Sequence, residues 1–186
     1  ENGLCALPNR EKDARQAIDQ ALDYARATGT RAVHVMAGNA SGPQAQATFV
    51  ANLTYACAQA GDKTILIEPL NPRNAPGYFL NNTGQACDII RAVGAPNLRL
   101  MFDCYHVQII EGDVTRRLTE LLPLIGHIQI ASVPDRGTPD HGELDYSFVL
   151  AHIAKLGWTA PIGAEYLPSQ DLGWLARYKH LKGLEE

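Results

Sequence analysis

Ile65-Leu66-Ile67-Glu68-Pro69-Leu70-Asn71 is the stretch that decides the fold of this 186-residue chain. In it an apolar strand runs directly into a carboxylate, which a proline and an amide follow. A buried strand that ends in an acid is typical of an α/β barrel, because such a barrel carries its functional side chains at the carboxyl ends of its strands. We therefore predict a strand over residues 63–67 and take Glu68 as a candidate functional residue.

Three later segments repeat this arrangement of an apolar strand followed by an oxygen-bearing side chain. The four polar residues are separated by 35, 26 and 36 residues, and each interval has room for a strand, a loop and a helix. Four oxygen donors are therefore expected at the ends of four successive strands. The three later segments are 98–102, 125–128 and 161–164, which lead into Asp103, Gln129 and Glu165.

Helices are predicted between the strands, where apolar residues recur at helical spacing between a polar cap and a glycine. The expected caps are Asn9, Thr83, Asp113 and Asp145. In the helix that follows Asp145, Phe148 is assigned to the buried face with Val149. The expected helices cover about 10–27, 43–60, 83–93, 113–122, 145–156 and 172–182, a further strand is expected over 31–36, and 104–112 and 132–144 are expected to be loops.

Strand and helix alternate along the whole chain, which predicts a parallel sheet with right-handed crossovers. The pattern contains about five strands and six helices. A closed barrel needs eight of each and typically about 250 residues. We therefore expect residues 1–186 to form a single domain of the parallel (β/α) TIM-barrel type, N-terminally truncated and lacking the first two to three strands. An open doubly wound sheet is the competing interpretation.

Composition narrows the class of function. The net charge of −4, without a clustered Lys/Arg face, argues against nucleic acid as a partner. The longest apolar runs have the length of strands, so no membrane partner is expected. Four cysteines lie singly without CxxC spacing, which favours free thiols and a cytoplasmic location.

The four strand-end residues form a ligand set made only of oxygen donors. Such a set suits a hard divalent cation, Mg²⁺ or Mn²⁺, and is poor for zinc. The simpler alternative is that acidic residues at strand ends cap the loops that follow, which is common for any one such residue. Four of them in register favour the metal site.

Five motifs carry a resemblance to a known family. They are similar to motifs of hydroxypyruvate isomerases, which belong to the xylose isomerase-like barrel superfamily and have 2-oxotetronate isomerases as near relatives. The likeness covers nearly the whole chain, from residue 4 onward. The motifs are Ile67-Glu68-Pro69-Leu70-Asn71, Phe102-Asp103-Cys104-Tyr105-His106, His127-Ile128-Gln129-Ile130-Ala131, Gly163-Ala164-Glu165-Tyr166 and the loop over 134–144.

The resemblance implies a role for each candidate residue. It implies that Glu68 and Glu165 transfer the proton, and that His106, Arg136 and, more weakly, Asn71 and Glu143 contact the substrate. Arg136 would bind a carboxylate of the substrate through two parallel hydrogen bonds. The implied metal ligands are Glu68, Asp103, Gln129 and Glu165.

The implied reaction interconverts a small 2-oxo acid and its 2-hydroxy aldehyde through an enediolate, with no redox cofactor. A ketose 3-epimerase needs the same paired acids, but its third strand-end ligand is usually His, where this chain has Gln129. A DNA-repair endonuclease is disfavoured by the acidic charge and by the small number of His ligands. A non-catalytic fragment that pairs with a second copy is the alternative from another class. His34, His127, His152 and His180 are interpreted as structural, with His127 on the same strand face as Gln129.

Overall fold

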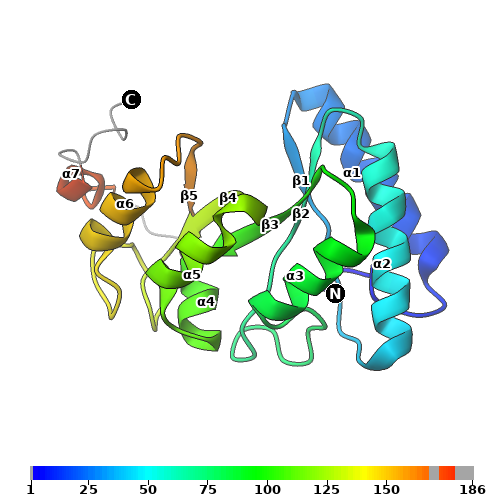
Figure 1. Ribbon diagram of the computed structural model, residues 1–186, viewed down its shortest axis with the longest axis horizontal. Helices are drawn as coiled ribbons and strands as arrows, with labels where there is room; N and C mark the ends of the chain where they lie inside the picture. Colours follow the sequence, from blue (N-terminus) through cyan, green and yellow to red (C-terminus); the bar gives the residue numbers. More distant parts are fainter. Residues whose placement is uncertain (1, 168–171, 179–186) are drawn as a thin grey trace. The chain divides into compact units, whose positions relative to one another are not determined.

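A computed structural model describes residues 2–167 and 172–178, in two compact units formed by Glu1–Met101 and Phe102–Glu186 (Figure 1). The first unit contains three helices that alternate with three strands, the last of which runs into the second unit. These elements are α1 (Glu11–Thr28), β1 (Ala32–His34), α2 (Gly42–Gln59), β2 (Thr64–Ile67), α3 (Thr83–Val93) and β3 (Leu98–Asp103).

The strand that carries the opening motif is the central strand of the first unit. Ile65 of β2 pairs in parallel register with Val33 of β1 on one side and with Leu98 of β3 on the other. Residues 65–67 are buried, as a strand covered on both faces should be. The three strands pair in chain order, without the reversal of order that a doubly wound sheet has at its switch point.

Helices α1 and α2 lie side by side in the first unit (Figure 1). The predicted apolar stripe of α1 is buried at Ala14, Ile18, Leu22 and Ala25, and Gly29 ends the helix in the left-handed conformation with φ 71°. Strand β1 is shorter than expected and ends at His34. The fold of this unit therefore follows the predicted pattern apart from the exact ends of its elements.

Two predicted helix caps in this unit are wrong by one residue. Arg10, not Asn9, is the N-cap of α1, and the N–H of Asn9 instead donates to the Glu11 carboxylate. Asn82, not Thr83, caps α3, because its Oδ1 accepts a hydrogen bond of 2.8 Å from the N–H of Gln85. At α3 the side chain of Asn82 thus accepts from a free N–H group of the helix, whereas Arg10 makes no side-chain cap bond at α1.

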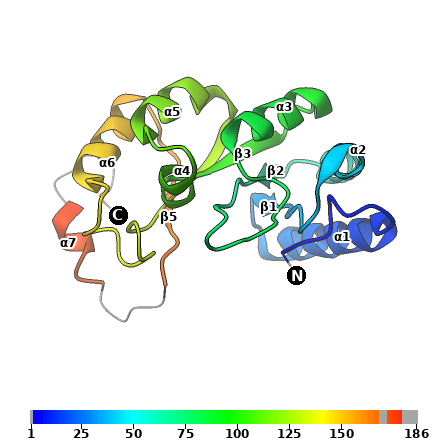
Figure 2. The same cartoon turned by 90° about the horizontal axis from the view of Figure 1, so that it is seen from below.

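The second unit continues the alternation, and its two complete strands, β4 and β5, are parallel. Figure 2 shows α5 and α6 beside one another in this unit. Its elements after β3 are α4 (Cys104–Ile110), α5 (Val114–Leu121), the 3₁₀ helix η1 (Leu122–Leu124), β4 (Ile125–Ile130), α6 (Tyr146–Lys155), β5 (Ile162–Ala164) and α7 (Leu175–Tyr178).

The expected loop over 104–112 is wrong, because Cys104–Ile110 forms helix α4. Asp103 caps this helix: its Oδ1 accepts from the N–H of Tyr105 at 2.9 Å. Residues 104–107 are all buried, so the segment lacks the alternation of polar and apolar residues that would have identified a surface helix. With α4 included, the described part of the chain has seven α-helices where six were expected.

Other expectations for the second unit have mixed outcomes. Asp145 caps α6 as predicted, accepting from the N–H of Ser147 at 2.9 Å. Asp113 occupies the N-cap of α5 but makes no side-chain cap bond. Phe148 is 64% exposed, so its assignment to the buried face of α6 is wrong. The last predicted helix is observed only over Leu175–Tyr178, and its expected end at 179–182 lies outside the described residues.

All four cysteines are buried free thiols, as the sequence predicted. Burial raises the pKa of the Cys5 thiol to about 12 and that of Cys57 to about 11, which keeps both in the unreactive protonated form. Among the described residues, no helix combines the length and the apolar character needed to cross a bilayer.

Candidate active site

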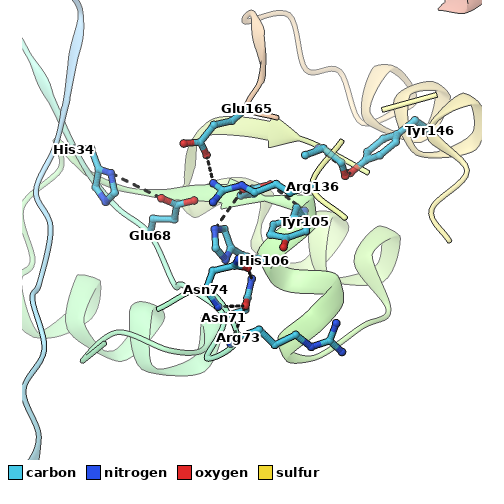
Figure 3. A network of polar contacts seen from close by, with 12 residues as sticks. His34, Glu68, Asn71, Arg73, Asn74, Tyr105, His106, Arg136, Tyr146 and Glu165 are labelled. Carbon is cyan, nitrogen blue, oxygen red and sulfur yellow. Dashed lines mark hydrogen bonds and ion pairs between the residues drawn. The ribbon is translucent and has the colours of Figure 1, made fainter. Parts of the chain in front are cut away.

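Glu68 follows the last residue of β2 and is 4% exposed. Its Oε2 lies 3.8 Å from Nδ1 of His34, the last residue of β1 (Figure 3). Burial lowers the pKa of His34 to about 4, so the imidazole beside this carboxylate is neutral near pH 7. The contact is therefore not an ion pair, because the imidazole carries no charge.

The sequence interpretation left His34 as a structural residue. It expected a strand that continues to Met36, which placed His34 inside the strand. Because β1 ends at His34, the rule that identified Glu68 from its strand end also identifies His34.

Asn71 shapes the loop that leaves Glu68. Its Oδ1 accepts hydrogen bonds of 3.1 Å from the N–H groups of Arg73 and Asn74, and its amide donates to the Asn74 side chain at 2.9 Å (Figure 3). The residue is fully buried. These bonds give Asn71 a role in loop structure, and its contact with a substrate stays a prediction.

In the second unit, Asp103 is the last residue of β3 and is 1% exposed. Burial raises its pKa to about 7; the N–H bond from Tyr105 and the nearby Arg136 lower it, and Glu165 raises it. While Oδ1 caps α4, Oδ2 lies 3.8 Å from Nε2 of His106. One oxygen of Asp103 thus has a structural partner and the other faces His106.

His106 lies in the first turn of α4 and is 2% exposed. Burial, together with Arg136, lowers its pKa to about 3. The imidazole is therefore neutral near pH 7, and its approach to Asp103 is not an ion pair. A neutral imidazole can donate one hydrogen bond to an oxygen without giving up a full proton.

Gln129 and His127 share one face of β4, as their spacing predicted. Gln129 pairs with Gly163 of β5. A Cβ atom placed on Gly163 would lie 3.0 Å from Nε2 of His127 and 3.3 Å from Cγ of Gln129. Both side chains therefore lie over Gly163, which leaves them room because it has no side chain.

Arg136 and Glu165 form an ion pair of 2.9 Å between Nη2 and Oε2 (Figure 3). The guanidinium carbon also lies 5.2 Å from the centre of the Tyr105 ring, within the range of a cation–π contact. Glu165 comes directly after β5, and its side chain is half exposed. The structure thus brings a carboxylate, a guanidinium and an aromatic ring together in the second unit.

Tyr105 is the residue that sequence reasoning missed in this group. Its ring contacts Arg136 and packs edge-to-face against the His106 ring at 5.2 Å. Its place between Asp103 and His106 in the sequence was the available signal.

The structure joins Asp103 to His106, Gln129 to His127 and Arg136 to Glu165, whereas Glu143 instead accepts a hydrogen bond of 3.2 Å from Gln108.

The second unit contains oxygen atoms that fit a cation. Oδ2 of Asp103 and Oε1 of Gln129 are buried and receive no hydrogen bond from the described residues. Buried polar oxygens without a donor are costly, and a hard divalent cation satisfies such oxygens. The donors present therefore suit Mg²⁺ or Mn²⁺ better than zinc.

Comparison with known proteins identifies the family. The family model described as xylose isomerase-like TIM barrel matches residues 2–183. A 2-oxo-tetronate isomerase of Cupriavidus necator is 47% identical over 188 residues, which cover 96% of this chain and 72% of that protein. The hydroxypyruvate isomerase of Escherichia coli is 36% identical, over 96% of this chain and 73% of its own length.

Solved structures agree on the fold. A Brucella melitensis protein described as an AP endonuclease of family 2 superposes with a TM-score of 0.90 at 38% identity, over 95% of this chain and 72% of that one. An L-ribulose 3-epimerase gives a TM-score of 0.78 at 21% identity, which shows a shared fold only. The chain belongs to the xylose isomerase-like TIM barrel family, among the relatives of hydroxypyruvate and 2-oxo-tetronate isomerases, and is an isomerase.

Proposed function

We propose that this isomerase depends on a divalent cation and interconverts a small 2-oxo acid of the hydroxypyruvate type with its 2-hydroxy aldehyde. The observation that carries the proposal is the pairing of Arg136 with Glu165 at 2.9 Å. It puts a cationic fork suited to a substrate carboxylate beside a carboxylate suited to proton transfer. The names of the two isomerases compared above support the same substrate class.

The proposed ligands of the cation are Glu68, Asp103, Gln129 and Glu165. Each stands at or beside the carboxyl end of its strand. In a (β/α) barrel these ends meet at one rim, where active sites are found. When bound, the cation would polarise the substrate's two neighbouring oxygens and stabilise negative charge there.

The two acids that transfer the proton are Glu165 and Glu68. Glu165 takes the C–H proton of the hydroxyl-bearing carbon of the 2-oxo acid, which gives an enediolate. Glu68, which starts the cycle protonated, delivers a proton to the former carbonyl carbon, and the hydroxyl proton passes to the former carbonyl oxygen. Solvent then takes the proton from Glu165 and restores that of Glu68, so the atoms balance without a redox cofactor. His106, neutral because of its burial, donates a hydrogen bond to an enediolate oxygen.

Arg136 selects the substrate in this proposal. Its guanidinium is held against the Tyr105 ring, so part of its rotational freedom is already lost before the substrate binds. A planar fork of donors fits a carboxylate through two parallel hydrogen bonds. A neutral ketose has no carboxylate for Arg136 to bind. Arg136 therefore favours a 2-oxo acid as the substrate over the ketose that a 3-epimerase would use.

The test is turnover of hydroxypyruvate in the presence of Mn²⁺ by the wild-type chain and by Glu165→Gln. The substitution keeps the size of the side chain and removes the base, so turnover should fall at least roughly a hundredfold. Glu120→Gln is the matched control, because the Glu120 side chain forms a surface ion pair with Arg116 on α5. Equal turnover in wild type and Glu165→Gln would exclude this role for Glu165.

An endonuclease activity is the second candidate, because the Brucella melitensis relative is described as an AP endonuclease. The chain itself argues against it. Its net charge is −4, whereas binding of a phosphate backbone draws on clustered Lys and Arg side chains. Incubation with a duplex that contains an abasic site distinguishes the two candidates, since we expect no cleavage.

A further inference from the structure

The segment 132–144, which carries Arg136, also holds a histidine between two carboxylates. Nε2 of His141 lies 2.8 Å from Oδ2 of Asp135, and its Nδ1 lies 3.2 Å from Oδ1 of Asp140. Both ring nitrogens are donors only in the protonated imidazole. One imidazolium can therefore bond both acids at once, and we call these three residues the His141 clamp.

The His141 clamp is bonded to the turn on either side of Arg136. The second oxygen of Asp135 accepts from the N–H of Gly137 at 3.2 Å. The N–H of Arg136 donates to the carbonyl of Ser132 at 2.9 Å, and the carbonyl of Gly137 accepts from the N–H of Ser132 at 3.0 Å. The bond between Asp135 and Gly137 thus links the clamp to the turn that the Ser132 bonds close around Arg136.

This turn needs support because Arg136 has φ 56°, in the left-handed region. Few residues other than glycine adopt that conformation, because it is energetically unfavourable for a residue with a side chain. The imidazole packs directly over the turn: a Cβ atom on Gly137 would lie 3.0 Å from Cε1 of His141 and 3.0 Å from Oδ2 of Asp135. Loss of the imidazole therefore uncovers the turn beside Arg136.

The charges around His141 favour its protonated form. The hydrogen bonds that His141 donates to Asp135 and then to Asp140 raise the pKa of His141, and the same contact with His141 is the main cause that lowers the pKa of Asp135 to about 2. From α7, Arg177 donates to the carbonyl of Asp140 and Tyr178 donates to the carbonyl of Pro139. These two bonds hold the far end of the segment, whereas at the near end the clamp adds to the backbone bonds of Arg136 with Ser132 and Leu167.

We infer that His141 is a positioning residue: by bonding Asp135 and Asp140 it holds the turn in which Arg136 presents its guanidinium to the substrate carboxylate. The inference rests on the proposed role of Arg136 in binding. It assigns His141 no contact with the substrate or with the reacting atoms. Loss of the clamp should therefore weaken binding and leave the chemical step unchanged.

The experiment compares His141→Ala, His141→Lys and the control His152→Ala in steady-state turnover of hydroxypyruvate. The side chain of His152 forms a hydrogen bond with Thr119 on the surface of α5, away from the clamp in the sequence. We expect KM to rise about threefold in His141→Ala with kcat unchanged, the size of effect that exposed charged pairs produce. His141→Lys keeps a positive charge between the acids and should return KM toward the wild-type value. An unchanged KM in His141→Ala, or an equal rise in His141→Lys, overturns the inference.

A second measurement separates this inference from the proposed function. Hydrogen exchange of the Arg136 and Gly137 amides reports on the turn without any turnover. We expect faster exchange of both amides in His141→Ala and nearly wild-type exchange in His141→Lys and His152→Ala. If the wild-type chain does not turn over hydroxypyruvate, the proposed function fails, and hydrogen exchange of the Arg136 and Gly137 amides then tests the positioning role by itself. Unchanged exchange of these amides in His141→Ala overturns that role.

Discussion

The guanidinium of Arg136 lies 2.9 Å from the carboxylate of Glu165, and its other face lies against the Tyr105 ring. The pairing means that a substrate carboxylate must share or replace Glu165 as the partner of Arg136. Such an exchange would bring the negative end of the substrate next to the proposed base. Recognition of the substrate and placement of the base thus involve the same side chain.

The first prediction concerns this side chain. Arg136→Lys retains the charge but loses the planar fork, and should raise KM for hydroxypyruvate roughly tenfold, the loss of one charge-assisted hydrogen bond. Arg136→Ala should raise it further. Steady-state kinetics check both, with Arg116→Lys on the surface of α5 as the control. Equal KM values in wild type and Arg136→Ala would show that Arg136 does not bind the substrate.

The second prediction concerns the buried carboxylate of Asp103. Asp103→Asn keeps an oxygen that can cap α4 and removes the buried charge. The metal-free variant should therefore melt a few degrees above wild type at pH 8, since about 1 kcal/mol corresponds to about 2–4 °C in a chain of this size. Wild type should gain stability with rising Mn²⁺, and Asp103→Asn should gain less. Melting curves with chelator and with Mn²⁺ test both parts, and identical gains would contradict the ligand role.

The third prediction concerns the space over Gly163. Gly163→Ala places a methyl group 3.0 Å from His127 and 3.3 Å from Gln129, so it should displace the Gln129 amide and weaken the response to Mn²⁺. The double variant Gly163→Ala/His127→Ala makes room for the methyl group. Recovery of the Mn²⁺ response in the double variant, relative to both single variants, would confirm the cause. An unchanged stability gain with Mn²⁺ in Gly163→Ala would show that the space over Gly163 does not fix the position of the Gln129 amide.

The fourth prediction is a pH dependence of the His141 clamp. The raised pKa of His141 means that its stabilising bonds are complete below the ordinary pKa and are lost as the pH rises through the raised value. The lowered pKa of Asp135, about 2, adds a loss at the acid end, between its ordinary value near 3.8 and about 2. KM of the wild type should therefore rise as the pH increases through the raised pKa of His141, whereas KM of His141→Lys should stay flat over the same range. Parallel profiles would contradict the clamp.

The fifth prediction tests the corrected cap of α3. Asn82→Ala removes the acceptor for the N–H of Gln85 and should cost about 1 kcal/mol of unfolding free energy. Asn82→Asp keeps the acceptor and should cost less. Urea unfolding measures both, and equal losses in the two variants would show that the cap bond is not the cause.

Much of the fold was predictable because it depends on local sequence. The apolar strands that lead to Glu68, Asp103 and Glu165 are visible as short runs in the sequence, and Gly29 and Gly94 mark the ends of helices by their left-handed backbone. Helix α4 was missed because residues 104–107 are all buried, so the sequence shows no alternation of polar and apolar residues there.

The candidate site was predictable only in part for the same reason. Its strand-end residues were identified from their immediate neighbours in the sequence. The contact of Tyr105 with Arg136 spans 31 residues, and that of Arg136 with Glu165 spans 29. Which side chains meet across such distances is set by the packing of the unit, so Tyr105 and His141 became visible only in the structure.

The most direct test of the proposed chemistry is hydrogen exchange between substrate and solvent. The chain is treated with chelator, supplied with Mn²⁺ and incubated with hydroxypyruvate in D₂O. Our account predicts deuterium on the carbon that receives the proton, at a rate that depends on Mn²⁺ and is lost in Glu165→Gln. Aldehyde formed without any deuterium would contradict proton transfer by solvent-exchanging carboxylates, and exchange of equal rate with chelator alone would contradict the role of the cation.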